Sequence, residues 1–217
     1  MSNGTFDFNE FIRESKEVLL NPKSYFSTMK TSGGMTEPLI KAVIYGAIAG
    51  VIAFIWSLLN LGAMGGSMFS GGFGIMILIW KIIGSIIGLF IGAVILLVIS
   101  SICKGNAGFE ANLRVTAAVM VVMPISAFFG FAIHINIYLG TIIGLAVSIF
   151  ALWLIYNGLV EALKTNPETT KIVAYVLIVI TVLFMIFTIG KLNKANRFMK
   201  EFNNQDMKEL RRDMEKK

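Results

Sequence analysis

The sequence is poor in the residues that build catalytic and metal centres. Its 217 residues include one cysteine, one histidine and four prolines, and charged residues make up only 15%. A single cysteine, Cys103, excludes an internal disulfide framework, and a single histidine, His134, has no second His or Cys to share a metal. We therefore expect no disulfide, no metal and no cofactor, with Cys103 a small packing residue and His134 an ordinary loop residue.

Motifs of catalysis are missing as well. The chain has no phosphate-binding loop, no HExxH, no serine nucleophile elbow and no pair of buried carboxylates. No series of acidic residues runs through its apolar segments, as a proton relay often requires. The N-terminus also lacks a basic start followed by an apolar stretch and a small-residue cleavage site, so no cleavable signal peptide is expected. The sequence gives no support for an enzyme.

Long apolar runs dominate what is present. Hydrophobic residues make up 56% of the chain and the mean hydropathy is +0.76. A helix needs roughly 20 apolar residues to cross a hydrocarbon core, where every backbone amide must be satisfied within its own segment. The pattern predicts an all-α polytopic membrane protein with a five-helix transmembrane bundle over residues 39–190. The predicted spans cover residues 39–61, 75–102, 113–133, 137–163 and 172–189.

Polar segments flank this membrane domain. Residues 1–38 combine apolar positions such as Phe8, Phe11 and Ile12 with charged ones at helical spacing, which predicts an amphipathic segment lying on the bilayer. Residues 191–217 form a charged, helical tail that holds nine of the nineteen basic residues. Basic residues beside apolar spans indicate topology or anionic lipid, so we expect the bilayer and not nucleic acid as the partner.

The basic residues also predict an orientation. With the N-terminus in the cytoplasm, the loops on that side hold seven basic residues near span ends: Lys23, Lys30, Lys41, Lys104, Arg114, Lys164 and Lys171. The opposite loops hold none, apart from Lys81 just inside the second run, where it can snorkel. Five spans then place the basic tail on the opposite side, against the positive-inside tendency.

Glycines at four-residue spacing predict where helices pack closely. Without a side chain, such positions let helix backbones approach within the membrane. The predicted packing positions are Gly46, Gly50, Gly84, Gly88, Gly92, Gly140 and Gly144. Internal packing is the favoured role, with a homo-oligomer interface as the alternative.

A few polar residues lie at or near membrane depth. Asn157 and Glu161 stand one turn apart at the end of the fourth run, so Glu161 can pair with Lys164, with Lys171 or with Arg114 of the preceding connection. We predict that Arg114, Asn157, Glu161 and Lys164 form a polar cluster, either a structural clamp or a ligand site. Pro124 predicts a kink in the third run.

The order of several short motifs resembles the Yip domain family (Ypt-interacting proteins). These motifs are LNPKSYF at 20–26, GGMTEPL at 33–39, GNAGF at 105–109, RVTAA at 114–118 and YNGLVEA at 156–162. The positions that carry the resemblance are Pro22, Pro38, Gly105, Phe109, Pro124 and Gly158. The resemblance covers about residues 20–190 and implies a five-helix membrane domain with a cytoplasmic N-terminus.

In eukaryotic members the resemblance also implies association with Rab-type small GTPases in vesicle traffic. This chain lacks their long N-terminal cytosolic region and looks more like a bacterial member of the cytoplasmic membrane. We expect a non-enzymatic scaffold that organises membrane or recruits a protein partner. A small-solute transporter or channel is one alternative, and a lipid-handling protein with an apolar lateral groove beside Lys81 or Arg114 is another.

Overall fold

The computed structural model describes residues 7–59, 72–106 and 108–190. Within these ranges the chain forms helices and no strand. It divides into two compact units, Met1–Ile178 and Val179–Lys217, and in the second the described residues continue a helix up to Gly190. The predicted basic tail, residues 191–217, lies outside the described residues.

The predicted all-helical membrane architecture is confirmed. Five helical segments of the described chain are long and apolar enough to cross a membrane: Thr36–Leu58, Ile75–Ile102, Phe109–Ile135, Ile137–Ala162 and Pro167–Gly190. The first forms helix α3 (Thr36–Leu58), which begins three residues before the predicted residue 39. Its first two turns include the charged residues Glu37 and Lys41. The second lies in α4 (Gly72–Ile102), which begins before the predicted residue 75.

The third span is interrupted, as Pro124 predicts. It consists of α5 (Phe109–Val119), α6 (Val122–Phe128), the 3-10 turn η1 (Phe129–Phe131) and α7 (Ala132–Ile135). Pro124 has no N–H to donate to the carbonyl of Met120, four residues earlier. The amide of Met123 donates to that carbonyl instead, at 2.9 Å. This bond spans three residues, so the chain takes a tighter turn between α5 and α6.

The outward faces of the long helices are apolar. Ile87, Ile91 and Ile95 on α4 are about half exposed, as are Val179 and Ile180 in the last helix. Such an area of apolar surface would be unstable in water but is the expected surface of a helix in contact with acyl chains. The chain is therefore an integral membrane protein in contact with the bilayer.

The glycine positions fall into two groups. A Cβ added at Gly46 or Gly50 of α3 would collide with α4, one at Gly92 would lie 2.8 Å from Cγ2 of Thr116, and one at Gly140 of α8 would collide with Ile133. Helix α8 runs from Ile137 to Asn157. At Gly84, Gly88 and Gly144 a Cβ would meet no atom of the described residues within 4 Å. Of the glycines predicted to permit close helix packing, four therefore do so within the described chain, namely Gly46, Gly50, Gly92 and Gly140.

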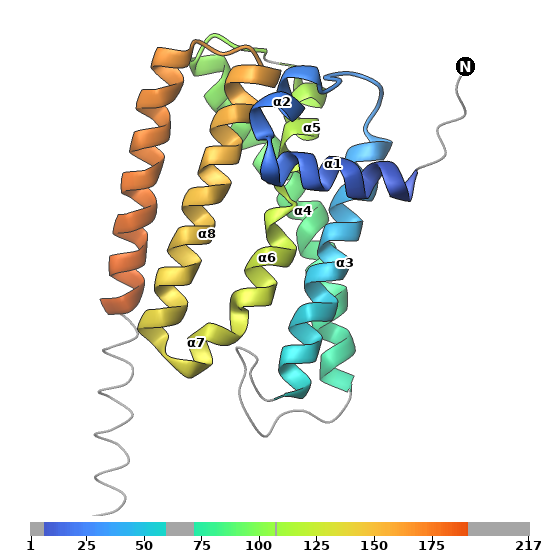
Figure 1. Ribbon diagram of the computed structural model, residues 1–217, viewed down its shortest axis with the longest axis vertical. Helices are drawn as coiled ribbons and strands as arrows, with labels where there is room; N and C mark the ends of the chain where they lie inside the picture. Colours follow the sequence, from blue (N-terminus) through green and yellow to red (C-terminus); the bar gives the residue numbers. More distant parts are fainter. Residues whose placement is uncertain (1–6, 60–71, 107, 191–217) are drawn as a thin grey trace, which may run out of the picture. The chain divides into compact units, whose positions relative to one another are not determined.

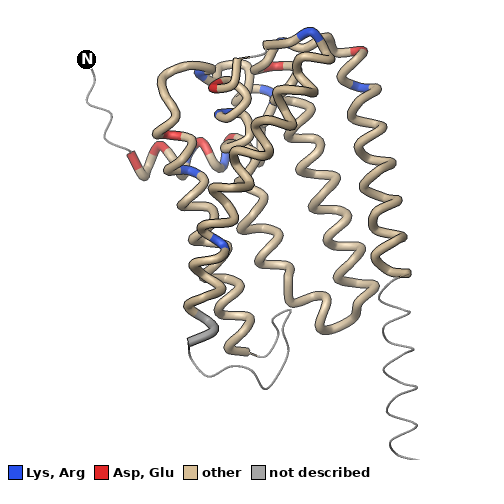
Figure 2. The backbone as a smooth tube through the Cα atoms, turned by 180° about the vertical axis from the view of Figure 1, so that it is seen from behind, with Lys and Arg blue, Asp and Glu red and all other residues tan. Residues whose placement is uncertain are grey.

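Two short N-terminal helices precede the spans. Helix α1 (Phe8–Leu20) starts at Asp7, whose carboxylate accepts hydrogen bonds from the amides of Asn9 and Glu10, and α2 (Pro22–Thr28) starts with a proline. Figure 1 shows α1 lying across the spans of the first unit, close to the end at which α3 begins. Charged residues gather at this end, and Lys81 is the single charged residue along α4 (Figure 2). We call α1 and α2 together the headpiece.

Candidate functional site

Helix α1 is docked on α3 by an aromatic and hydrogen-bonded contact. Phe11 and Val18, one face of α1, are 4% and 1% exposed. The ring of Phe11 lies 5.0 Å from that of Tyr45, and the hydroxyl groups of Ser15 and Tyr45 are 2.8 Å apart. Spacing of 11, 15 and 18 places these side chains on one helical stripe. The headpiece is thus packed on the chain's own first span.

A chain of ion pairs fixes the same contact. The ammonium group of Lys41, on α3, lies 2.6 Å from Glu14 of α1 and 2.7 Å from Glu37. Glu37 also binds Arg114 of α5 at 2.9 Å. Lys41 and Arg114 are each 7% exposed, so each has little contact with bulk water and depends on these carboxylates. One network therefore joins α1, α3 and α5.

The connection between α2 and α3 is held by α5. Arg114 donates to the carbonyl of Gly34 at 2.9 Å, and the amide of Gly34 donates to the carboxylate of Glu110 at 2.6 Å. Gly34 has φ +95°, a left-handed backbone conformation that glycine adopts without a steric penalty. Glu110 also lies 3.3 Å from Arg114. Glu110 and Arg114, one helical turn apart, thus bind the amide and the carbonyl of the same residue, Gly34.

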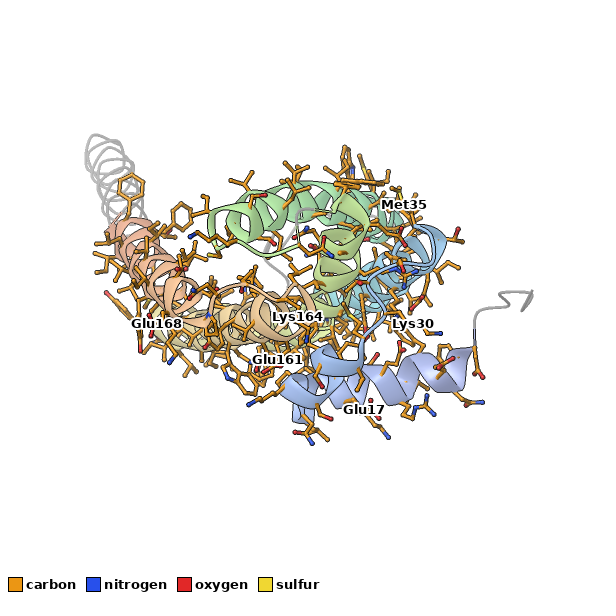
Figure 3. All side chains as sticks on the ribbon, turned by 90° about the horizontal axis from the view of Figure 1, so that it is seen from above. Glu17, Lys30, Met35, Glu161, Lys164 and Glu168 are labelled. Atoms are coloured by element: carbon orange, nitrogen blue, oxygen red, sulfur yellow. The ribbon has the colours of Figure 1, made fainter. Side chains whose placement is uncertain are left out.

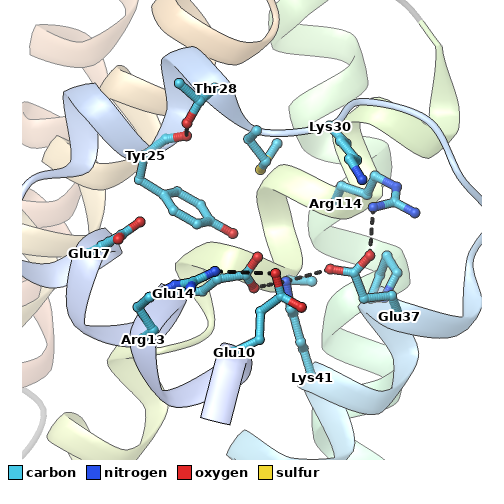
Figure 4. A pocket seen from close by; sticks show the side chains of 13 residues that line it. Glu10, Arg13, Glu14, Glu17, Tyr25, Thr28, Lys30, Glu37, Lys41 and Arg114 are labelled. Carbon is cyan, nitrogen blue, oxygen red and sulfur yellow. Dashed lines mark hydrogen bonds and ion pairs between the residues drawn. The ribbon is translucent and has the colours of Figure 1, made fainter. Parts of the chain in front are cut away.

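A polar cavity of about 330 Å³ lies between the headpiece and the first turns of α3 and α5. Four carboxylates line it: Glu10, Glu14, Glu17 and Glu37. Four cations line it as well: Arg13, Lys30, Lys41 and Arg114. Figure 4 shows the acidic side chains of α1 on one side of the cavity, with Lys30 and Arg114 across from them. Within the cavity charges of opposite sign lie next to one another, since Lys41 lies between Glu14 and Glu37 and Arg13 pairs with Glu10.

Tyr25 of α2 points into this cavity (Figure 4). Its side chain is 93% removed from solvent, since only 7% of the residue is exposed. Burial raises the pKa of Tyr25 well above its usual value, so the hydroxyl stays protonated at neutral pH. Among the residues that the structure describes, this hydroxyl has no hydrogen-bond partner, and it remains available to a ligand.

Comparison with known protein families decides the relationship of the chain. The family model of the Yip1 domain matches residues 16–189, which cover the spans up to residue 189 and the lining of the cavity from Glu17 onward, but not Glu10, Arg13 and Glu14. The chain belongs to the Yip1 domain family. No curated protein and no solved structure matches it significantly. The Yip1 domain family is a family of non-enzymatic, multi-pass membrane proteins, which agrees with the five apolar helices.

The Yip1-domain motifs take structural positions around the site. Pro22 starts α2 and Pro38 lines the cavity from the first turn of α3. Phe109 begins α5 and stacks on Phe90 of α4, with ring centroids 6.4 Å apart. Gly158 lies where a Cβ would meet Val115 and Phe26, so the headpiece packs closely there. These positions shape and support the headpiece.

Gly105 belongs to a contact between two connections of this Yip1-domain protein. The amide of Asn106 donates to the carbonyl of Leu163 at 2.7 Å. The amide of Asn166 donates to the backbone carbonyl of Cys103 at 2.9 Å. A Cβ at Gly105 would lie 2.8 Å from the carbonyl oxygen of Leu163. Cys103 is fully buried, in keeping with a packing role. Glycine is needed here because the two backbones approach closely.

The predicted polar residues are not assembled as a single cluster. Arg114 belongs to the network with Glu37, whereas Glu161 lies 3.9 Å from Lys23 of α2. Asn157 donates to the carbonyl of Trp153 in its own helix at 2.7 Å. Lys164 is exposed, with φ 53°, just after the π-helical turn η2 (Gly158–Ala162). Figure 3 shows Glu161 and Lys164 just beyond the end of α8, at a distance from Met35, which precedes α3.

Sequence reasoning placed Glu161 beside Lys164, Lys171 or Arg114, and the structure gives it another partner. The reason is the headpiece, which folds back onto the bundle and brings Lys23 to Glu161. The same folding brings Glu14 and Tyr25 to the site, and neither was predicted. A usable signal was present in Glu37 and Lys41, whose four-residue spacing at the start of an apolar run predicts a helical ion pair.

Proposed function

We propose that this protein acts as a non-enzymatic scaffold of the membrane, with the headpiece as its recruiting surface. The observation that carries the proposal is the ion-pair network of Glu14, Lys41, Glu37 and Arg114, in which the two cations are buried. A network whose cations are 7% exposed holds α1 at one place on the bundle. A headpiece held in one position presents a defined surface to a partner, which a flexibly tethered helix would not.

The outer face of the headpiece offers charges of both signs. Lys16 of α1 and Lys23 of α2 are exposed, and the exposed residues Glu10, Arg13 and Glu17, which also line the cavity, add charges of both signs. Exposed charges set the specificity and the association rate of a protein partner more than its affinity. A partner with complementary charges is therefore the occupant that this face suits, whether another protein or a second copy of the chain.

The proposed orientation places the headpiece in the cytoplasm, in keeping with the seven basic residues near the span ends on that side. In a bacterial cell the membrane would be the cytoplasmic membrane. The basic tail would then lie on the opposite side, where its lysines and arginines can contact anionic lipid.

A photo-crosslinking residue placed at Lys16 tests the recruiting surface. We expect a discrete protein adduct at Lys16, and none at Ile142, an exposed apolar position of α8 that faces lipid. The adduct should fall several-fold when Lys41→Met loosens the headpiece. Adducts of equal intensity at Lys16 and Ile142, or an adduct at Lys16 that Lys41→Met leaves unchanged, would contradict the proposal.

Solute flux separates the scaffold from a transporter. Proteoliposomes that contain the full chain should be no more permeable to small ions and solutes than empty liposomes. A flux that the Glu161→Ala variant abolishes would contradict the scaffold role, because Glu161 would then act on a permeation path.

A further inference from the structure

Helix α1 has a second apolar flank that the docking on α3 does not bury. Phe8 is 58% exposed and Ile12 is 37% exposed, and Leu19 is partly buried beside them. At about 100° per residue, these three positions fall within an arc of about 40°. The flank is distinct from the face of Phe11 and Val18, which contacts the protein.

The cavity lies on the opposite side of α1 from this flank. Its lining residues Glu10, Arg13 and Glu17 point between about 120° and 180° away from the centre of the apolar arc. An interfacial helix places its apolar side toward the acyl chains and its charged side toward the headgroups. With Phe8 and Ile12 in the hydrocarbon, the cavity opens at the level of the headgroups.

The position of α1 along α3 agrees with this depth. Its contacts are with Lys41 and Tyr45, and Lys41 lies about 8 Å from the start of α3 at Thr36. The apolar run of the first span continues beyond these residues. The headpiece thus meets the bundle at the boundary between hydrocarbon and headgroups.

The charges of the cavity favour a zwitterion over an anion. The lining carboxylates and cations are equal in number, and Glu110, which also binds Arg114, adds one further negative charge. Lys41 and Arg114 are already bound by carboxylates. Within the described chain, Lys30 and Glu17 form no ion pair, so one cation and one anion are free for a ligand.

The hydroxyl of Tyr25 supplies a polar atom to which a ligand could form a hydrogen bond. Tyr25 is 7% exposed and points into the cavity, and its hydroxyl forms no hydrogen bond within the described chain. A volume of about 330 Å³ is at the lower limit of ligand sites and is roughly tenfold the share of one water molecule in the liquid. A cavity of that size can accommodate a lipid headgroup but is too small for two acyl chains.

We infer that this cavity binds the headgroup of phosphatidylethanolamine from the adjacent leaflet. The primary ammonium donates to Glu17 and Glu14 and to the oxygen of Tyr25, and the phosphate is bound by Lys30. A primary ammonium has three N–H donors, which the quaternary ammonium of phosphatidylcholine lacks. Phosphatidylglycerol has no cation and would leave the acidic side of the cavity unpaired. The inference does not depend on the scaffold role.

Native mass spectrometry of the full chain in detergent tests the site. The protein is incubated with phosphatidylethanolamine, phosphatidylcholine or phosphatidylglycerol of matched acyl chains. We expect phosphatidylethanolamine to be retained about tenfold more than phosphatidylglycerol and several-fold more than phosphatidylcholine. Equal retention of the three lipids, or a preference for phosphatidylglycerol, would overturn the inference.

Variants locate the binding. Lys30→Ala and Glu17→Gln change exposed residues, and Tyr25→Phe removes one hydroxyl from a buried ring. Each should lower retention of phosphatidylethanolamine about tenfold, because each removes a hydrogen bond to a charged group. Lys16→Ala, an exposed lysine of α1 outside the cavity, should bind as the native chain does. Unchanged retention in both Lys30→Ala and Glu17→Gln would overturn the inference.

A competition experiment separates the lipid from its soluble headgroup. Glycerophosphoethanolamine should displace the lipid only at a concentration at least a hundredfold higher, because it lacks acyl chains in the detergent phase. Displacement at equal concentration would assign the site to a soluble phosphoethanolamine compound and overturn the assignment to the leaflet.

Discussion

At the scale of the residue, Lys41 decides how the headpiece is held. The residue is 7% exposed, and its ammonium group lies within 2.7 Å of carboxylates from α1 and α3. Two buried ions attract each other strongly in a medium of low dielectric, but each also loses its hydration. Such a group is stabilising only while all of its partners are present, which makes Lys41 sensitive to substitution.

We predict that Lys41→Met destabilises the protein by about 3 kcal/mol, because Glu14 and Glu37 are left without their shared cation. Thermal unfolding in detergent micelles measures the change. Lys16→Met, at an exposed position of α1, should change stability by less than about 0.5 kcal/mol. Adding Glu14→Gln to Lys41→Met should recover part of the loss. Equal stability of the two single variants would contradict the role of the network.

At the scale of the element, glycine and proline set how the helices meet and break. Gly105 permits the contact between the connection that follows α4 and the one that follows η2. Pro124 sets the break between α5 and α6 by freeing the carbonyl of Met120. Both residues act through the backbone, so substitutions at these positions change geometry and not charge.

Gly105→Ala should cost about 1–3 kcal/mol, since a Cβ would lie 2.8 Å from a backbone oxygen that has little freedom to move. The matched control is Gly84→Ala on α4, where a Cβ would meet no described atom within 4 Å. That control should be neutral or slightly stabilising because alanine favours a helix. Thermal unfolding of both variants is the measurement, and equal effects would refute a close contact at Gly105.

Pro124→Ala should lengthen the regular helix, because the new amide can donate to the carbonyl of Met120. Hydrogen exchange of the peptide that covers residues 119–124 is then expected to slow. Pro38→Ala is the control, because Pro38 lies in the first turn of α3, where an amide has no acceptor within the helix. Exchange that stays as fast in Pro124→Ala would mean that packing, and not the proline, causes the break.

At the scale of the whole molecule, an odd number of spans governs the topology. Among the described residues, five helical segments are long and apolar enough to cross the membrane. The positive-inside tendency favours a cytoplasmic headpiece but disfavours export of the basic tail. With five spans the positive-inside tendency cannot be met at both ends of the chain. The side of the membrane on which the C-terminus lies is therefore informative.

We predict that a reporter fused after Lys217 lies on the opposite side of the membrane from one fused before Met1. A pair of compartment-specific reporters, one active in the cytoplasm and one outside it, measures each end. Both ends on the cytoplasmic side would mean that one of the five helices does not cross, and the topology would have to be redrawn.

The sequence by itself determined the class of the molecule. Hydropathy predicted five spans, because lipid requires long apolar helices whatever their arrangement. Pro124 predicted the break in the third span for a similar reason, since a missing N–H acts locally. The order of short motifs predicted the family that the match over residues 16–189 shows.

Only the tertiary structure decided the site. Glu14, Tyr25 and Lys41 come from three different helices and meet because the headpiece folds back onto α3. Periodicity shows that α1 has an apolar face, but it cannot say whether that face meets lipid or protein. The structure shows that Phe11 packs on Tyr45 while Phe8 remains exposed. Contacts between residues distant in sequence depend on packing, which no local pattern specifies.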